Sequence, residues 1–225
     1  MILANLYNQV DRTLPLLMER RTAYKAAKDY RKTGMAFVHI PRTAGLSLLN
    51  AVYGSTTIRH FALDRLYRSA PDMHELPIFT VSRNPWDRVV SSYLIAQRGG
   101  AEGGAEMAFP HRYQGREFMS FSTFVHKYLA ARDVWSLDPV FRPQVYYVGG
   151  FAESRFDHVG RFEDLPATVS WLSETLGREV ALPHANRIDH PPYQSFYDDA
   201  TRRVVGKVYR DDVQAFGYSF EGIVG

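Results

Sequence analysis

The sequence contains no cysteine among its 225 residues. Its absence excludes disulfide bonds and thiolate metal sites and is typical of a reducing compartment, so we expect a cytoplasmic protein. No apolar run approaches the ~18 residues that a membrane span needs, and segment 14–18 lacks the small-residue cleavage site of a signal peptide. We therefore expect neither a transmembrane segment nor a targeting peptide.

Basic charge is scarce outside one end of the chain, although the pI is about 9.1. Residues 1–34 hold seven Lys and Arg against three Asp and Glu, whereas the other 191 residues hold 20 against 21. A nucleic-acid-binding protein would show a wider basic face with aromatic side chains among the charges. We therefore expect no nucleic-acid partner.

The basic segment carries a helical pattern of apolar residues. They lie three or four positions apart and predict an amphipathic helix over residues 1–32, at Leu3, Leu6, Val10, Leu14 and Leu17. Pro15 is expected to kink or split this helix, and Gly34 to end it. Residues 1–225 are then a single domain with 1–34 as an N-terminal helical arm. This arm either packs on its own domain or serves as a docking arm or as the dimer arm of a homodimer.

Strands and helices alternate along the rest of the chain. The pattern predicts strands at 36–40, 77–82, 144–149 and 156–162, and helices at 48–53, 85–97, 120–131, 165–176 and 198–215. Alternation of this kind predicts an α/β fold, with a mainly parallel sheet flanked by helices. The connection 97–118 has little periodic pattern and is either a lid or binding loop, or a disordered surface insertion.

The turn after the first strand reads Pro-Arg-Thr-Ala-Gly-Leu-Ser over residues 41–47. Small residues and Gly45 let the backbone wrap closely around a ligand, and the following helix points N–H groups and its positive dipole end at the turn. Arg42 adds a cation and Ser47 a hydroxyl. The Gly-Lys-Ser/Thr ending of a Walker A loop is absent, and no magnesium ligand is evident, which counts against ATP or GTP hydrolysis. Taken alone, the turn is either a plain helix cap or an anion cradle.

The turn after the second strand places Arg83 at a strand end beside another helix N-terminus. Asn84 and Ser91 are seven residues apart, close to two helical turns, so Ser91 returns to the same helix face. Arg83 and Ser91 could then hold one phosphate together. The alternative is a structural ion network of Arg83, Asp87 and Arg88, which explains Asp87 better than it explains an Arg at a strand's carboxyl end.

These two turns resemble the phosphate-binding motifs of PAPS-dependent sulfotransferases. Residues 41–47 are similar to the 5′-phosphosulfate loop of that family, and residues 83–93 to its 3′-phosphate motif, including the eight-residue step from Arg83 to Ser91. The stretch 159–165 and the ending Phe216-Gly217-Tyr218 resemble the carbohydrate sulfotransferases, particularly their compact bacterial members. The resemblance covers roughly residues 36–220 and implies a P-loop-NTPase-like sulfotransferase fold.

The resemblance also implies a donor, an acceptor and a set of roles. The donor is PAPS, with PAP as product and no metal, and the acceptor is a hydroxyl of a carbohydrate or glycolipid. The 3′ phosphate is held by Arg83 and Ser91, and the 5′ phosphosulfate by the side chain of Arg42, which also assists catalysis, and by the backbone of Thr43, Ala44, Gly45, Leu46 and Ser47. The family usually has Lys in place of Arg42 and Thr in place of Leu46. Arg keeps the charge but is bulkier, and the lost Thr hydroxyl removes one donor.

The expected catalytic base is His60. It lies between the two motifs, where similar sequences carry a His, and histidine titrates near the working pH. His39, His74 and His111 are alternatives, of which His39 falls inside a buried strand. Two rival functions remain open: another nucleotide-dependent transferase such as a kinase, and a non-catalytic protein that binds PAP or PAPS.

Overall fold

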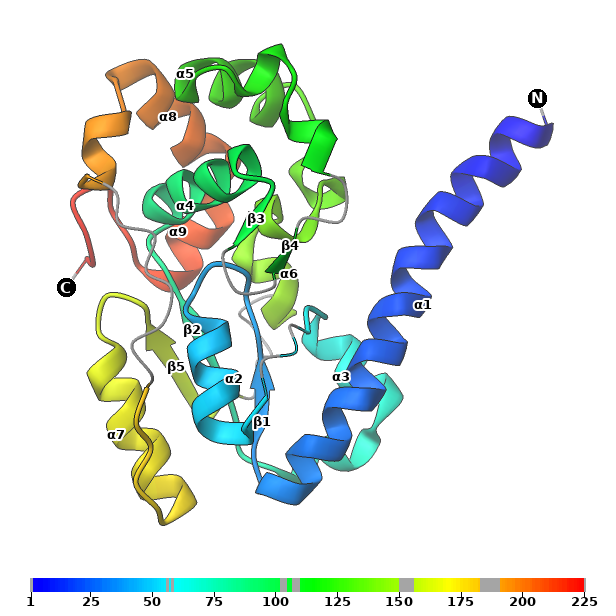
Figure 1. Cartoon of the computed structure of the whole chain (residues 1–225), viewed down its shortest axis with the longest axis vertical. Helices are drawn as coiled ribbons and strands as arrows, with labels where there is room; N and C mark the ends of the chain where they lie inside the picture. Colours follow the sequence, from blue (N-terminus) through cyan, green and yellow to red (C-terminus); the bar gives the residue numbers. More distant parts are fainter. Residues whose placement is uncertain are drawn as a thin grey trace.

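A small parallel sheet forms the centre of the protein, which we describe from a computed structural model (Figure 1). The structure describes residues 2–55, 57, 59–101, 105–106, 110–149, 156–182 and 191–224. Strands β1 (Ala36–Val38), β2 (Ile78–Ser82) and β5 (His158–Arg161) pair in the order β1-β2-β5, all parallel. A separate antiparallel pair joins β3 (Gly100–Ala101) and β4 (Ala105–Glu106).

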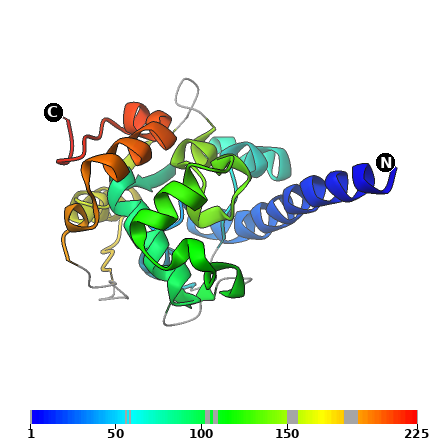
Figure 2. The same cartoon turned by 90° about the horizontal axis from the view of Figure 1, so that it is seen from above.

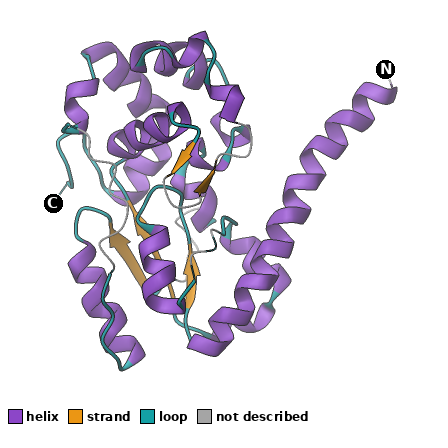
Figure 3. Ribbon diagram, viewed as in Figure 1, coloured by secondary structure: helices purple, strands orange, loops and turns teal. Residues whose placement is uncertain are grey.

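Helices flank the sheet, as the secondary-structure colouring of Figure 3 shows. They are α1 (Ile2–Thr33), α2 (Gly45–Tyr53), α3 (Leu63–Ser69), α4 (Pro85–Gln97), α5 (Phe121–Thr123), α6 (Gln144–Val148), α7 (Leu165–Leu176), α8 (Asp199–Val208) and α9 (Arg210–Phe216). Shorter helical turns are η1 (Pro71–Glu75), η2 (Pro110–Tyr113), η3 (Arg116–Phe118), η4 (Phe124–Leu129), η5 (Val134–Ser136), η6 (Pro139–Phe141) and η8 (Tyr193–Phe196). The predicted α/β class, with a parallel sheet flanked by helices, is confirmed.

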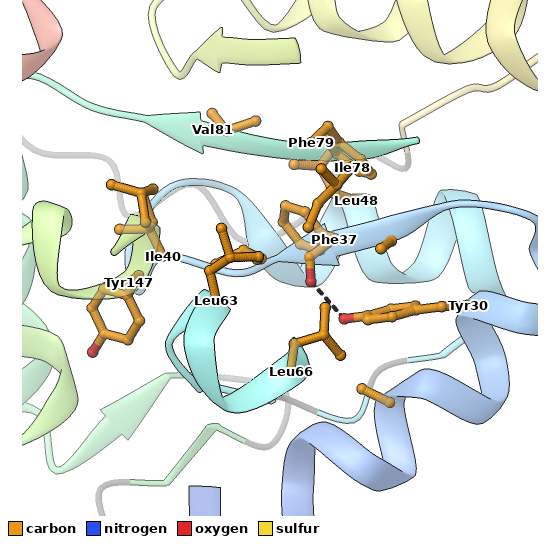
Figure 4. Packing of buried hydrophobic residues seen from close by; sticks show 14 of the residues in the cluster. Tyr30, Phe37, Ile40, Leu48, Leu63, Leu66, Ile78, Phe79, Val81 and Tyr147 are labelled. Carbon is orange, nitrogen blue, oxygen red and sulfur yellow. Dashed lines mark hydrogen bonds between the residues drawn. The ribbon is translucent and has the colours of Figure 1, made fainter. Parts of the chain in front are cut away.

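The core explains why the central strand is apolar. All five residues of β2 are buried, as expected for a parallel strand covered on both faces. Phe37 of β1 stacks on Phe79 of β2, with ring centroids 4.5 Å apart. The hydroxyl of Tyr30, on α1, donates to the carbonyl of Phe37 at 2.5 Å, which fixes α1 to the sheet (Figure 4). A second, aromatic-rich cluster packs around α4, α5, η4 and α8.

Helix α1 is one unbroken helix, so the prediction that Pro15 splits it is wrong. Its carboxyl-terminal half packs on the body through Ala23, Ala26, Ala27 and Tyr30, all buried. Its amino-terminal half extends away from the body in both views (Figures 1 and 2). It ends where predicted, because Gly34 takes a positive φ of 75° after Thr33. None of the helices in the described part of the chain is both long and apolar enough to span a bilayer.

The clearest error is the strand predicted at 144–149, which is helix α6. The run Gln-Val-Tyr-Tyr-Val favours a strand by composition. However, the buried carboxylate of Asp212 accepts hydrogen bonds from the backbone N–H groups of Gln144 and Val145, at 2.8 and 2.9 Å. A carboxylate at a helix N-terminus satisfies N–H groups that would otherwise have no partner. The cap comes from a residue far along the chain and overrides the local preference.

Other elements differ in detail from the prediction. Helix 198–215 is two helices, α8 and α9, which part at Tyr209, and helix 120–131 is largely the π-helical turn η4. The expected strands 36–40 and 156–162 are shorter, as β1 and β5, and the helix expected at 48–53 begins at Gly45. The connection 97–118 has short elements of its own, and its residues Tyr113 and Phe118 are buried in the core.

Candidate functional site

The two predicted turns lie side by side because their strands are neighbours. Strands β1 and β2 pair in parallel, with Phe37 opposite Phe79 and Val38 opposite Thr80. Their carboxyl ends therefore meet at one edge of the sheet, where ligands of α/β proteins gather. The turn before α2 leaves from one strand and the turn before α4 from the next. Two sequence motifs about forty residues apart thus form one site.

The first turn has an unusual backbone. Arg42 and Ala44 take positive φ values of 72° and 63°, a region that non-glycine residues seldom adopt. Such conformations cost about 1–3 kcal/mol each and gather at functional sites. Thr43 is fully buried, and its hydroxyl donates to the carbonyl of Ile40 at 2.8 Å. Thr43 thus stabilises the turn with its side chain.

Helix α2 begins directly at this turn with its N–H groups uncapped by any side chain. The first N–H groups of a helix have no intrahelical partner, and they carry the positive end of the dipole. In α2 these belong to Gly45, Leu46 and Ser47. The bend through Arg42 and Ala44 therefore presents a set of N–H donors at the strand end, which suits an anion.

Gly45 is required here by space. A Cβ atom on Gly45 would lie 1.7 Å from Nε2 of His39, so the imidazole packs directly against this glycine. His39 is buried and stacks with Phe37. Its Nδ1 atom has no hydrogen-bond partner among the described residues. The close packing lets α2 begin right beside the end of β1.

The side chains of both turns meet. Nε of Arg42 donates to the hydroxyl of Ser91, on α4, at 3.0 Å. Nη1 of Arg83 donates to the backbone carbonyl of Arg42 at 3.1 Å. The structure therefore brings together Arg42, Arg83 and Ser91, with the loop of the first turn between the two arginines. It pairs Ser91 with Arg42, whereas the sequence suggested Arg83.

Arg83 is held on several sides. Nε donates to the carboxylate of Asp87 at 2.8 Å, and the guanidinium lies 4.0 Å from the ring centre of Phe162. The backbone of Arg83 is fixed by the side-chain amide of Gln144, which accepts from its N–H at 2.9 Å and donates to its carbonyl at 2.8 Å. The pairing of Arg83 with Asp87 expected from a structural network is therefore present.

Arg88 belongs to that structural part. It is buried, and its guanidinium donates to the backbone carbonyls of Pro41 and Arg142, both at 2.9 Å. These bonds fix the start of the first turn against the segment before α6. Arg88 therefore has a structural role at the site.

Three guanidinium groups crowd this edge of the sheet. Burial, together with the charges of Arg83 and Arg88, lowers the pKa of Arg42 to about 10, so Arg42 stays charged at neutral pH. Arg83 has a direct carboxylate partner, while the hydrogen bonds described for Arg42 and Arg88 go to a hydroxyl and to carbonyls. Placing like charges together away from water is unfavourable unless an anion neutralises them. The cluster is therefore a candidate site for an anion.

His60 lies at the border of this cluster. Its ring centre is 4.5 Å from that of His39, and its Nδ1 lies 3.4 Å from the carbonyl oxygen of His39. Burial, with the charges of Arg88, Arg42 and Arg142, lowers its pKa to about 4, although the bond to the carbonyl acts in the opposite direction. Burial also lowers the pKa of His39, helped by His60 and Arg42. Both imidazoles are therefore neutral at pH 7.

A buried polar chain behind Arg83 could not be foreseen as a unit. Asp212 binds the N-terminus of α6, and the first residue of α6, Gln144, binds the backbone of Arg83. Burial raises the pKa of Asp212 to about 6. On the other side, the carboxylate of Glu163 accepts from the N–H of Asn84 at 2.7 Å. The sequence signal for Gln144 and Glu163 is their polar type within apolar surroundings.

Comparisons with known proteins found nothing: no family model, no curated protein and no solved structure matches the chain. Across the described residues, no group of three or more His, Asp or Glu side chains is placed to hold a metal ion.

The histidine environment gives a pH prediction. The folded pKa of His60 lies below the 6.5 of an unfolded chain, so the unfolded state binds more protons between about pH 4 and 6.5. The contribution of neutral His60 to the free energy of unfolding is fully present above pH 6.5. About 3 kcal/mol of it is lost as the pH falls towards 4. Unfolding by urea at pH 4.5, 5.5 and 7 should show a smaller loss in His60→Gln than in the parent. An imidazole NMR titration of His60 with a midpoint near 6.5 would contradict this account.

Proposed function

We propose that the protein is a PAPS-dependent sulfotransferase that transfers the sulfuryl group to a hydroxyl of a carbohydrate or glycolipid acceptor. The observation that carries the proposal is the contact of Arg42 with Ser91 and of Arg83 with the Arg42 carbonyl, at adjoining strand ends. Two cationic turns, each before a helix N-terminus, suit a nucleotide with separate 5′ and 3′ charges. A P-loop-like sulfotransferase fold is part of the proposal, as is a cytoplasmic location, which the lack of cysteine fits.

The proposed roles follow the two turns. Arg42 and the backbone from Thr43 to Ser47 hold the 5′ phosphosulfate, and Arg83 with Ser91 holds the 3′ phosphate. The uncapped N–H groups of α2 and the three nearby guanidinium groups supply charge stabilisation with little reorganisation. The hydrogen bond from Arg42 to Ser91 links residues proposed for the two phosphates, so we expect binding at one position to be coupled to binding at the other.

The transfer itself needs an in-line attack. The acceptor oxygen forms a bond to sulfur as the bond between sulfur and the phosphate oxygen breaks. The bonding electrons leave on that phosphate oxygen, which gives PAP, and the acceptor proton passes to a base. Charge grows on the departing oxygen, where Arg42 and the α2 N–H groups can stabilise it.

His60 is the base in this proposal. Its Nδ1 faces a carbonyl oxygen, which can only accept, so we assign the proton to Nδ1 and the free lone pair to Nε2. The lowered pKa keeps the imidazole neutral at pH 7, so that Nε2 has a lone pair, but it also makes His60 a weaker base than the histidine titrating near the working pH that the sequence predicts. His39 is less suited because its Nε2 lies against Gly45, with no space for an acceptor between them.

One rival function has a feature in its favour. Arg42 replaces the usual Lys of the family loop, Leu46 replaces a Thr, and the Arg42 guanidinium is bonded to Ser91. A protein that binds PAP without transferring sulfate could tolerate such changes. Tight PAP binding without transfer to any member of a broad acceptor panel would favour that alternative, and a preference for ATP over PAP would favour a kinase.

Binding of the donor product is the first prediction of the proposed function. PAP at one hundred times its Kd should stabilise the fold by about 2.7 kcal/mol and raise Tm by roughly 5–10 °C, with a smaller shift for AMP. Arg83→Ala should remove the difference between PAP and AMP, because it deletes the guanidinium assigned to the 3′ phosphate. Arg68→Ala, at an arginine whose side chain is 70% exposed, is the matched control and should keep the difference. Equal shifts with PAP and AMP in the parent protein would contradict the donor assignment.

The second prediction concerns the base. His60→Ala should keep PAP binding and lose transfer from PAPS by roughly 10²–10⁴-fold, because proton removal is then left to water. The control is His74→Ala, which removes a histidine that stacks on Tyr67 and has no role in the proposed transfer. Transfer is measured with labelled PAPS and a panel of glycan and glycolipid acceptors. Full transfer activity in His60→Ala would refute the assignment.

A further inference from the structure

A groove near the arginine cluster of Arg42, Arg83 and Arg88 suits a second ligand. It has a volume of about 760 Å³ and lies between α3, η5, α6 and α9. Ligand sites commonly have volumes of 300–1,000 Å³. The residues that matter for its chemistry are Asp64, Arg65, Trp135, Tyr146, Asp211 and Gln214. None of the residues of the two turns lines it, so it is a separate part of the surface.

One wall of the groove is aromatic. Trp135 is 45% exposed, although tryptophan, which has the largest side chain, is highly buried on average. Its ring centre lies 6.5 Å from that of Tyr146, and the two planes make an angle of 60°. Both rings line the groove. A flat face of C–H groups, such as that of a pyranose ring, packs well against an aromatic face.

The remaining walls carry hydrogen-bonding groups of both signs. The carboxylates come from Asp64 and Asp211, the amide from Gln214 and the guanidinium from Arg65. Nη1 of Arg65 pairs with Asp64, while its buried Nε has no hydrogen-bond partner among the described residues. Donors and acceptors of mixed charge favour a neutral ligand rich in hydroxyl groups over an anion or a cation.

The groove adjoins the surroundings of His60. Ala62, at its edge, is two residues beyond His60. The guanidinium of Arg142 lies 4.9 Å from the ring centre of Tyr146 and is also one of the charges that act on His60. In the proposal, the end of the ligand beside Ala62 and Tyr146 is the end that faces His60.

Helix α1 holds the aromatic wall in place. The carboxylate of Glu19, on α1, accepts from the hydroxyl of Tyr146 at 2.8 Å and from Arg142 at 2.9 Å. Both partners of this ion pair are largely buried, at 13% and 11% exposure. The N-terminal helix thus supports the aromatic wall of the groove through Glu19.

We infer that this groove binds a neutral sugar ring of the acceptor, stacked on Trp135 and hydrogen-bonded by Asp64, Asp211 and Gln214. The inference rests on the proposed sulfotransferase function for the link to His60. The binding itself depends only on the groove. It assigns acceptor recognition to α3, η5, α6 and α9.

Saturation-transfer NMR tests this on the full chain with saturating PAP. The probes are methyl glycosides of glucose, galactose, mannose and N-acetylglucosamine, together with lactose and cellobiose. At least one should bind the parent protein. Its Kd should rise roughly tenfold or more in Trp135→Ala and stay within about threefold in Trp135→Phe, which keeps an aromatic face. Tyr24→Ala removes another exposed aromatic side chain, 63% exposed on α1, and should leave the Kd unchanged.

Gln214→Leu gives a second variant, on an exposed position of α9, in case Trp135→Ala does not fold. It should weaken binding of the same sugar several-fold. Unchanged sugar binding in these variants, or no binding of any probe to the parent, would overturn the inference. A thermal shift with PAP on the same samples separates the two claims. A PAP shift without sugar binding would refute only the inference that the groove binds a sugar. Sugar binding that depends on Trp135, without a PAP shift, would refute the sulfotransferase proposal but not sugar binding in the groove.

Discussion

The parallel pairing of β1 with β2 is the constraint on which the site depends. It sets Phe37 opposite Phe79 and brings two turns of unrelated sequence to one edge of the sheet. Three guanidinium groups then crowd together, and only Arg83 has a direct carboxylate contact among the pairs described. Without a ligand, the repulsion between these charges destabilises the folded state, and an anion bound there would reduce it. If this edge binds an anion, as we propose, the ligand stabilises the fold when it binds.

Residues far from the two motifs in the sequence hold the arginine cluster in position. Gln144 fixes the backbone of Arg83 from both sides, and Asp212 fixes Gln144 through the N-terminus of α6. Because these groups are fully buried, each leaves an unsatisfied partner if it is removed. A second chain of contacts runs from Glu19 on α1 to Tyr146 and Arg142. Helix α6 therefore stands between the arginine cluster and the groove, and supports both.

Local patterns in the sequence sufficed for the parts of the fold that local interactions decide. The apolar run of β2 and the cap of Asn84, which accepts from Trp86 N–H, predict a buried strand followed by α4. The common edge of the two turns follows from parallel pairing. Helix α6 could not be predicted, because its cap, Asp212, is 67 residues from Val145. Nor could the pairing of Arg42 with Ser91, or the packing of His39 on Gly45, since side-chain direction depends on the whole fold.

The central claim is that the two turns bind both charged ends of one nucleotide. Titration of PAP followed by ³¹P NMR tests it directly, because the 5′ and 3′ phosphates give separate resonances. The account predicts that both resonances shift on binding with one common Kd, and that Ser91→Ala weakens both because Ser91 bonds to Arg42. A shift of the 5′ resonance alone, with the 3′ resonance unchanged at saturation, would contradict it.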